Sequence, residues 1–294
     1  MVLLIAGITV ACWGLWLAPT QNVQMQHQGV KTFYISLAFL LLAIIVAFTQ
    51  GVPTYTLTSF FLPFIGGFLW SISSLFAFIG TRNLGLAKAI GVWAPLNIVV
   101  SVFWGAVLFK ELINLSGMLV VWFVIALILM IGGVLLIVFA KGSGTAEVQK
   151  RSILSGFMGA VGAGILWGSY FIPMKLSNSS AWVSSLPFAL GMFATGVGMV
   201  LTARVSFRLE KKQDYVRVMG AGVLWGIGNY TMLLLTDAIG AGKGFSIAQL
   251  AVAVNALLGV YVLKDPAPKT RAAAYTLIGC ILAMIGGIIL GNMR

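Results

Sequence analysis

Long apolar stretches alternate with short polar connections along the whole chain. Each stretch is close to the roughly 20 residues that a helix needs to cross the hydrocarbon layer of a membrane. The pattern therefore predicts an all-α, polytopic membrane protein with ten transmembrane helices, at residues 2–18, 32–49, 59–80, 87–109, 117–139, 153–173, 181–203, 217–236, 243–263 and 271–291.

The second half of the chain repeats motifs of the first half. Trp13-Gly14 returns as Trp167-Gly168, 154 positions later, and Met130-Ile131-Gly132-Gly133 returns at the same separation as Met284-Ile285-Gly286-Gly287. Each copy holds five predicted helices, and an odd number of crossings makes the second copy enter the membrane in the opposite orientation. We therefore expect two inverted five-helix repeats, residues 1–145 and 146–294, a layout typical of secondary transporters.

The composition favours a membrane protein over a soluble one. Hydrophobic residues make up 60% of the chain and charged residues 8%, whereas soluble domains average about 25% charged residues. The net charge of +12 does not indicate nucleic-acid binding, because the basic residues lie mainly in short connections, where lipid headgroups and the rules of membrane insertion account for them. The partner that the composition predicts is the lipid bilayer.

Basic residues gather in the connections on one side of the predicted bundle. If both termini lie outside, most of the 18 Lys and Arg residues fall in inside loops, above all in the connection 204–217. Positively charged loops tend to stay on the cytoplasmic side of a membrane. We therefore expect a multi-pass protein of a bacterial cytoplasmic membrane with both termini outside.

The ionisable residues form no recognisable catalytic or metal-binding pattern. The six acids fall in loops or at helix ends, and His27 is the only histidine. General acid–base catalysis needs such groups within reach of one another in a cleft. The sequence therefore predicts neither an enzyme nor a bound metal or cofactor. Cys12 and Cys280 fall inside predicted helices and are interpreted as membrane-buried thiols.

Aromatic and amide side chains are the candidate binding groups within the predicted helices. An amide facing lipid would be costly, so the amides should point into the bundle. Indole rings can cover the apolar faces of a sugar while amides bond to its hydroxyls. Packing and interhelical hydrogen bonds remain the alternative for each residue. The candidates are Trp13, Trp70, Trp93, Asn97, Trp167, Trp225, Asn229, Gln249 and Asn255.

Three further features bear on helix geometry and coupling. Pro95 is expected to interrupt the fourth helix, with a kink satisfied by neighbouring helices as the alternative, and Pro173 is expected to end the sixth. Asp237 is the acid best placed for ion coupling, near the outer mouth, although a surface ion pair is the simpler interpretation. Glycine pairs such as Gly164 and Gly168 allow close helix packing within the bundle, and they leave a homodimer open as the alternative.

The motifs of the second copy resemble those of the drug/metabolite transporter superfamily, and most closely its glucose/ribose uptake porters and rhamnose–proton symporters. The resemblance rests on the stretches 222–229 and 244–250, on Gly259 and on Lys264-Asp265. It implies uptake of a monosaccharide by alternating access, with a proton as a candidate coupling ion. It also makes Gln249 a candidate substrate contact.

The same residues are compatible with two other functions. A tryptophan-lined pocket also suits a cationic or aromatic metabolite, because indole faces attract quaternary ammonium groups. A membrane scaffold that carries no solute would have no central cavity. The carrier hypotheses predict that Trp225, Asn229 and Gln249 line one cavity between the two halves.

Overall fold

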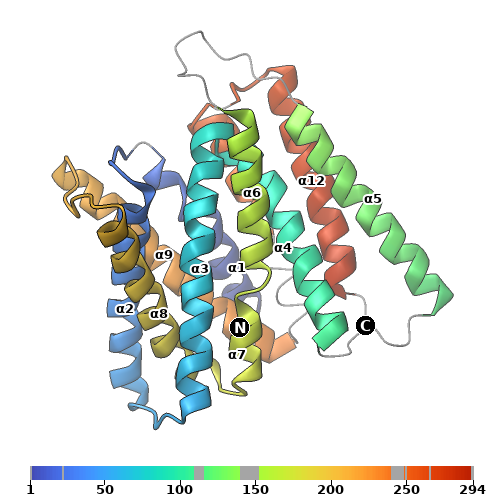
Figure 1. Cartoon of the computed structure of the whole chain (residues 1–294). Helices are drawn as coiled ribbons and strands as arrows, with labels where there is room; N and C mark the ends of the chain where they lie inside the picture. The colour runs from blue at the N-terminus through green and yellow to red at the C-terminus, as the bar shows by residue number, and fades with distance from the viewer. Residues whose placement is uncertain are drawn as a thin grey trace.

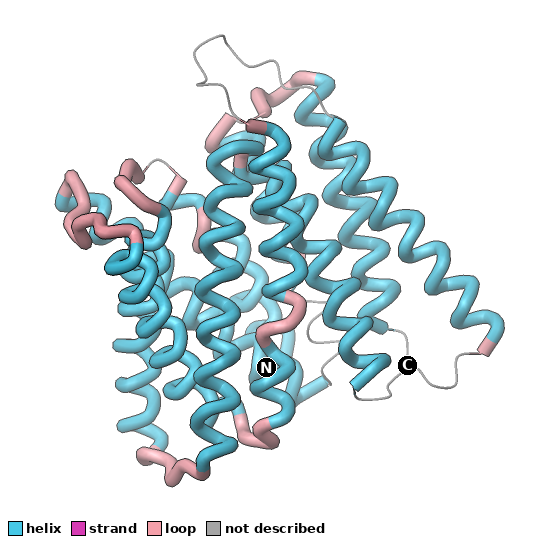
Figure 2. The backbone as a smooth tube through the Cα atoms, viewed as in Figure 1, coloured by secondary structure: helices cyan, strands magenta, loops and turns pink. Residues whose placement is uncertain are grey.

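The described residues of the computed structural model form a bundle of helices joined by short loops (Figure 2). The structure describes residues 2–21, 23–108, 116–139, 152–239, 248, 250–264 and 266–292, and no strand occurs among them. The helices are α1 (Val2–Leu15), a 3₁₀ turn η1 (Ala18–Thr20), α2 (Gln28–Gln50), α3 (Leu57–Leu84), α4 (Leu86–Leu108), α5 (Gly117–Phe139), α6 (Ile153–Trp167), α7 (Phe171–Leu176), α8 (Ala181–Thr202), α9 (Lys212–Ile239), α11 (Ala251–Leu257), a π-helical turn η2 (Leu258–Val262) and α12 (Arg271–Asn292).

Eight helical segments in the described part of the chain are long and apolar enough to cross a membrane. Each segment starts at the first residue of one helix, and these helices are α1, α2, α3, α5, α6, α8, α9 and α12. Shorter apolar helices, Leu86–Ser101 and Ala251–Val262, lie where the fourth and ninth membrane helices are predicted. Part of the predicted ninth helix lies outside the described residues. The protein is therefore an all-helical, multi-pass membrane protein.

In the view of Figure 1, α1, α3, α4 and α6 lie between the two edges of the bundle. Helices α5 and α12 pack against each other at one edge of the bundle, and α2, α8 and α9 lie at the opposite edge. Helix α3 packs on α6 and α8, while α9 packs on α1 and α2. These contacts join helices from the first half of the chain to helices from the second half.

The outer and inner surfaces of the bundle differ in chemistry. Helix α5 exposes Trp122, Ile128 and Ile131, as a helix in contact with lipid should. Inside the bundle, small polar side chains donate hydrogen bonds to carbonyls of neighbouring helices. Ser71 on α3 bonds to Met192 O of α8, and Ser73 bonds to Ala163 O of α6, both at 3.0 Å. Such bonds add to van der Waals packing where lipid supplies no hydrophobic drive for helix association.

The interruption expected at Pro95 does not occur, and the sixth helix breaks before Pro173. Helix α4 continues on both sides of Pro95, because a proline removes one backbone hydrogen bond while the neighbouring turns keep theirs. Pro173 does not end a helix but lies in the first turn of α7, where a missing N–H costs little. The helix is interrupted earlier, at Gly168–Tyr170, which form the loop between α6 and α7 in Figure 2.

Gly164 and Gly168, and in the same way Gly222 and Gly226 on α9, face other helices of the same chain. A Cβ added to Gly164 or Gly168 would lie within 3 Å of α4 atoms, and one added to Gly222 or Gly226 would lie as close to α2. These glycines therefore serve packing within the bundle. A homodimer stays an untested prediction.

Candidate functional site

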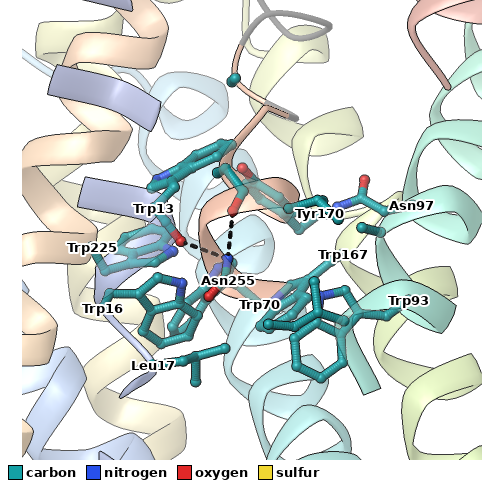
Figure 3. A pocket seen from close by; sticks show the side chains of 15 residues that line it. Trp13, Trp16, Leu17, Trp70, Trp93, Asn97, Trp167, Tyr170, Trp225 and Asn255 are labelled. Carbon is teal, nitrogen blue, oxygen red and sulfur yellow. Dashed lines mark hydrogen bonds between the residues drawn. The ribbon is translucent and has the colours of Figure 1, made fainter. Parts of the chain in front are cut away.

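A cavity lies at the centre of the bundle, where helices of both halves of the chain meet (Figure 3). Its volume is about 80 Å³. Side chains reach it from α1, α3, α4, α6, α9 and α11 and from the turns that follow α1 and α6. The lining residues are Trp13, Trp16, Leu17, Trp70, Ile90, Trp93, Ala94, Asn97, Trp167, Tyr170, Trp225, Ala248, Ala251, Val252 and Asn255.

The size of the cavity suits a small organic solute. One water needs about 10–15 Å³ of such volume, so the cavity has room for roughly six waters. At a liquid share of about 30 Å³ per water, six waters occupy the space of a small, compact solute.

Six of the fifteen residues that line the cavity are tryptophans. The rings of Trp16, Trp70 and Trp167 lie about 6 Å apart, with centroid distances of 6.0–6.2 Å. Trp225 packs on Trp70 at 4.4 Å, and Trp93 meets Trp167 edge to face at 5.3 Å. Contacts of this kind add to the stability from buried area and fix the orientation of the rings. The wall therefore offers rigid, flat apolar surfaces.

Polar groups interrupt this aromatic wall at a few positions. Asn255 and Asn97 contribute amides, and Tyr170 contributes a hydroxyl. The Oδ1 of Asn255 and the indole N–H groups of Trp13 and Trp167 are buried and have no hydrogen-bond partner among the described residues. A buried polar group without a partner costs about 1–3 kcal/mol. A solute with hydroxyl groups could satisfy such atoms, and an entirely apolar solute could not.

The described lining carries no permanently charged side chain. A cation in this cavity would gain cation–π attraction from the rings but would find no carboxylate among these residues to balance its charge. A neutral solute would not incur this cost. The arrangement therefore favours a neutral, polyhydroxylated solute.

Breaks in two helices bring aromatic residues into the wall. Helix α1 ends at Leu15, and the turn that follows carries Trp16. Helix α6 ends at Trp167, and the following turn carries Tyr170. Trp16 and Tyr170 occupy matching positions of the two sequence copies, as Trp13 and Trp167 do. The same local break thus occurs once in each half, and each time the turn adds one aromatic residue to the tryptophan at the end of the helix.

The structure brings most of the sequence-derived candidates together. Seven of them line the cavity, namely Trp13, Trp70, Trp93, Asn97, Trp167, Trp225 and Asn255. Gln249 lies outside the described residues, as does the side chain of Asp237, so their roles stay predictions.

Asn229 is the candidate that the structure places elsewhere. It lies on α9 and is buried, and its Nδ2 has no hydrogen-bond partner in the described part of the chain. It does not belong to the cavity lining. Asn229 therefore does not share the lining of this cavity with Trp225.

Sequence reasoning missed Trp16 and Tyr170. Each lies three positions after a candidate tryptophan, in the turn that follows the helix. The repeat contained the signal, because both copies carry an aromatic residue at that position. The break that turns both side chains toward the cavity becomes visible only in the structure.

Known proteins resemble this chain over its whole length. The model of the protein family described as sugar transport protein matches residues 4–293. A putative sugar uptake protein of Enterococcus faecalis (strain ATCC 700802 / V583) is 28% identical over the full length of both chains. The glucose uptake protein GlcU of Bacillus subtilis (strain 168) is 23% identical over 89% of this chain and 88% of its own. One solved crystal structure covers 97% of this chain and 94% of its own, with a TM-score of 0.64 and 18% identity, which shows a shared fold.

Proposed function

This chain belongs to the sugar transport protein family, and we propose that it carries a neutral monosaccharide across the membrane by alternating access. The observation that carries the proposal is the central cavity, with its indole rings and amides and no permanent charge among the described lining residues. Sugar rings have apolar faces and a hydroxyl-rich edge, and this wall offers complementary groups for both. The names of the relatives, which refer to sugar and glucose uptake, support the same substrate class.

The proposal includes two inverted repeats, residues 1–145 and 146–294, that meet at this cavity. Contacts between helices of the two copies occur in equivalent pairs, which supports the repeats. Helix α3 of the first copy packs on α6 of the second, and the equivalent helix of the second copy, α9, packs on α1 of the first. A Cβ on Gly14 would lie 2.5 Å from the Val254 Cβ, and one on Gly168 would lie 2.7 Å from the Val100 Cβ. Both residues of the first pair lie 154 positions from their counterparts in the second pair.

Such an arrangement is suited to alternating access. Two similar units that face each other across a solute site can rock so that the site opens to one side at a time. The proposal includes kinship with the drug/metabolite transporter superfamily and its rhamnose–proton symporters. Coupling to a proton through Asp237 stays a prediction.

We further propose that both termini lie outside the cell. The start of α1 and the end of α12 lie on the same side of the bundle (Figure 1). The connection between α8 and α9 lies at the other end of the bundle and carries exposed Arg204, Arg208 and Lys211. Positive charge of this kind is typical of cytoplasmic loops.

Cysteine labelling tests this orientation. Lys211→Cys is expected to react with an impermeant maleimide only after the membrane is permeabilised, whereas Thr54→Cys, in the loop between α2 and α3, should react in intact cells. Both positions are exposed, and the native Cys12 and Cys280 are buried, so background labelling should be low. Labelling of Lys211→Cys in intact cells would reverse the proposed orientation.

A thermal-shift screen of the purified protein tests the substrate class. D-glucose, D-ribose and L-rhamnose are compared with choline and tryptamine, because a ligand that binds the folded state raises its apparent stability. At a concentration of about 100 times Kd, the stabilisation is about 2.7 kcal/mol. We expect at least one sugar to raise the melting temperature and the two cations to leave it unchanged. A response to the cations alone would favour the carrier of cationic metabolites.

A further inference from the structure

Asn255 is held in the cavity wall in one fixed orientation. It lies on α11, is 5% exposed, and its amide sits among the aromatic side chains of the wall (Figure 3). Its Nδ2 donates to the carbonyl of Ala251 at 3.0 Å, within α11, and to the carbonyl of Trp13 at 3.2 Å, on α1. The two N–H groups of the amide therefore both have acceptors.

The contact with Trp13 has a clear local cause. The last turn of a helix leaves carbonyl groups without intrahelical donors, and Trp13 lies in the last turn of α1. Asn255 supplies a donor for one of these carbonyls from another helix. A flipped amide would point its oxygen at two carbonyl oxygens, so this network selects one orientation.

The fixed orientation leaves one acceptor without a partner. The Oδ1 of Asn255 is buried and has no donor among the described residues. Leaving such an oxygen unpaired costs about 1–3 kcal/mol, and a solute that donates a hydrogen bond to it removes this cost. A solute group that can only accept hydrogen bonds would place a lone pair against this oxygen and leave it without a donor.

From this geometry we propose that Asn255 determines specificity by accepting a hydrogen bond from one hydroxyl group of the bound sugar. The inference rests on the proposed sugar transport. It adds the direction of one hydrogen bond, which the sugar hydroxyl donates and the Oδ1 of Asn255 accepts. Sites built to bond a substrate hydroxyl reject analogues that lack it far more strongly than apolar pockets reject an extra group. One hydroxyl of the substrate should therefore be required as a donor.

Deoxy and fluoro sugars test this inference on the unaltered protein. A C–F group can accept a weak hydrogen bond but cannot donate one. D-glucose and D-ribose are compared with derivatives in which each hydroxyl in turn is replaced by hydrogen or by fluorine. At one carbon, both replacements are expected to weaken binding about tenfold or more, equivalent to about 1.4 kcal/mol. If fluorine restores binding at every carbon where hydrogen weakens it, the inference is wrong.

Substitution then assigns this requirement to Asn255. In Asn255→Leu, the parent sugar should bind as weakly as the derivative lacking the critical hydroxyl, and that derivative should bind as it does to the unaltered protein. Discrimination at the other carbons should persist. A change in stability alone would weaken all derivatives equally and would not remove the discrimination at one carbon.

Asn229→Leu is the matched control. Asn229 is also a buried amide with an unpaired atom, but it lies outside the cavity lining. This variant is expected to keep the full pattern of discrimination. Loss of the pattern in both variants, or in neither, would overturn the role of Asn255 while sugar binding by the unaltered protein would still support the proposed function. Absence of binding by both parent sugars would overturn the proposed function and this inference together.

Discussion

Trp70→Leu is expected to weaken sugar binding by at least about tenfold, or about 1.4 kcal/mol. Trp70 is 2% exposed, lines the cavity, and its ring contacts those of Trp16, Trp167 and Trp225. Leucine keeps part of the apolar volume but removes the flat surface on which a sugar ring can lie. It also removes the contacts that orient the neighbouring rings. Equilibrium binding of the sugar to the purified variant measures the effect.

A second aromatic residue separates this effect from a general loss of stability. Phe188 on α8 is fully buried and stacks on Trp225 at 6.1 Å, but it does not line the cavity. Phe188→Leu should lower the melting temperature and leave the Kd of the folded fraction within about twofold, since the cavity wall keeps its rings. Equal losses of affinity in both variants would show that the ring surface of Trp70 has no direct part in binding.

Gly191→Ala is expected to have the largest effect on folding. An added Cβ would lie 2.0 Å from the carbonyl oxygen of Phe64 on α3, and a Cβ on Gly67 of α3 would lie 2.0 Å from the carbonyl oxygen of Phe188. The two helices approach each other backbone to backbone at reciprocal positions. Because no flexible side chain can yield there, α3 and α8 must move apart. Overpacking of this kind costs about 1–3 kcal/mol, and the Ser71 bond between the two helices would lengthen.

The measurement is the melting temperature and the yield of monodisperse protein in detergent. Gly198→Ala on the same helix is the control, because a Cβ there would meet no atom within 4 Å. This control should be neutral or slightly stabilising, since alanine favours the helix. A Gly191→Ala variant as stable as the control would mean that α3 and α8 are not in close contact in the membrane.

The membrane class and the general nature of the site follow from local features of the chain. Apolar segments of membrane-spanning length must become helices, because only intrahelical hydrogen bonds satisfy their backbone groups in lipid. Helices such as α2, α5 and α8 therefore lie close to the ranges expected from hydropathy. Amides and tryptophans inside such segments stand out for the same reason, and most of those selected line the cavity.

Other features depend on contacts between distant parts of the chain. A proline ring shows where a backbone bond is missing, but the effect on a helix depends on its place in a turn and on its neighbours. Pro95 is therefore accommodated inside α4, while the sixth helix breaks at Gly168 and leaves Pro173 in a new first turn. Likewise, Asn229 and Asn255 are both buried amides, and only packing decides which of them lies at the cavity.

The sequence by itself determined that this protein lies in the membrane, that its halves repeat, and that aromatic and amide groups are the available binding chemistry. These properties depend on residue type and spacing, which act locally or through the solvent. The tertiary structure alone decided that Trp16 and Tyr170 join the cavity lining, that Asn229 does not, and that the Oδ1 of Asn255 has no hydrogen-bond partner among the described residues. Each of these outcomes depends on the distance between atoms of different helices, and that distance is set by the packing of the whole bundle.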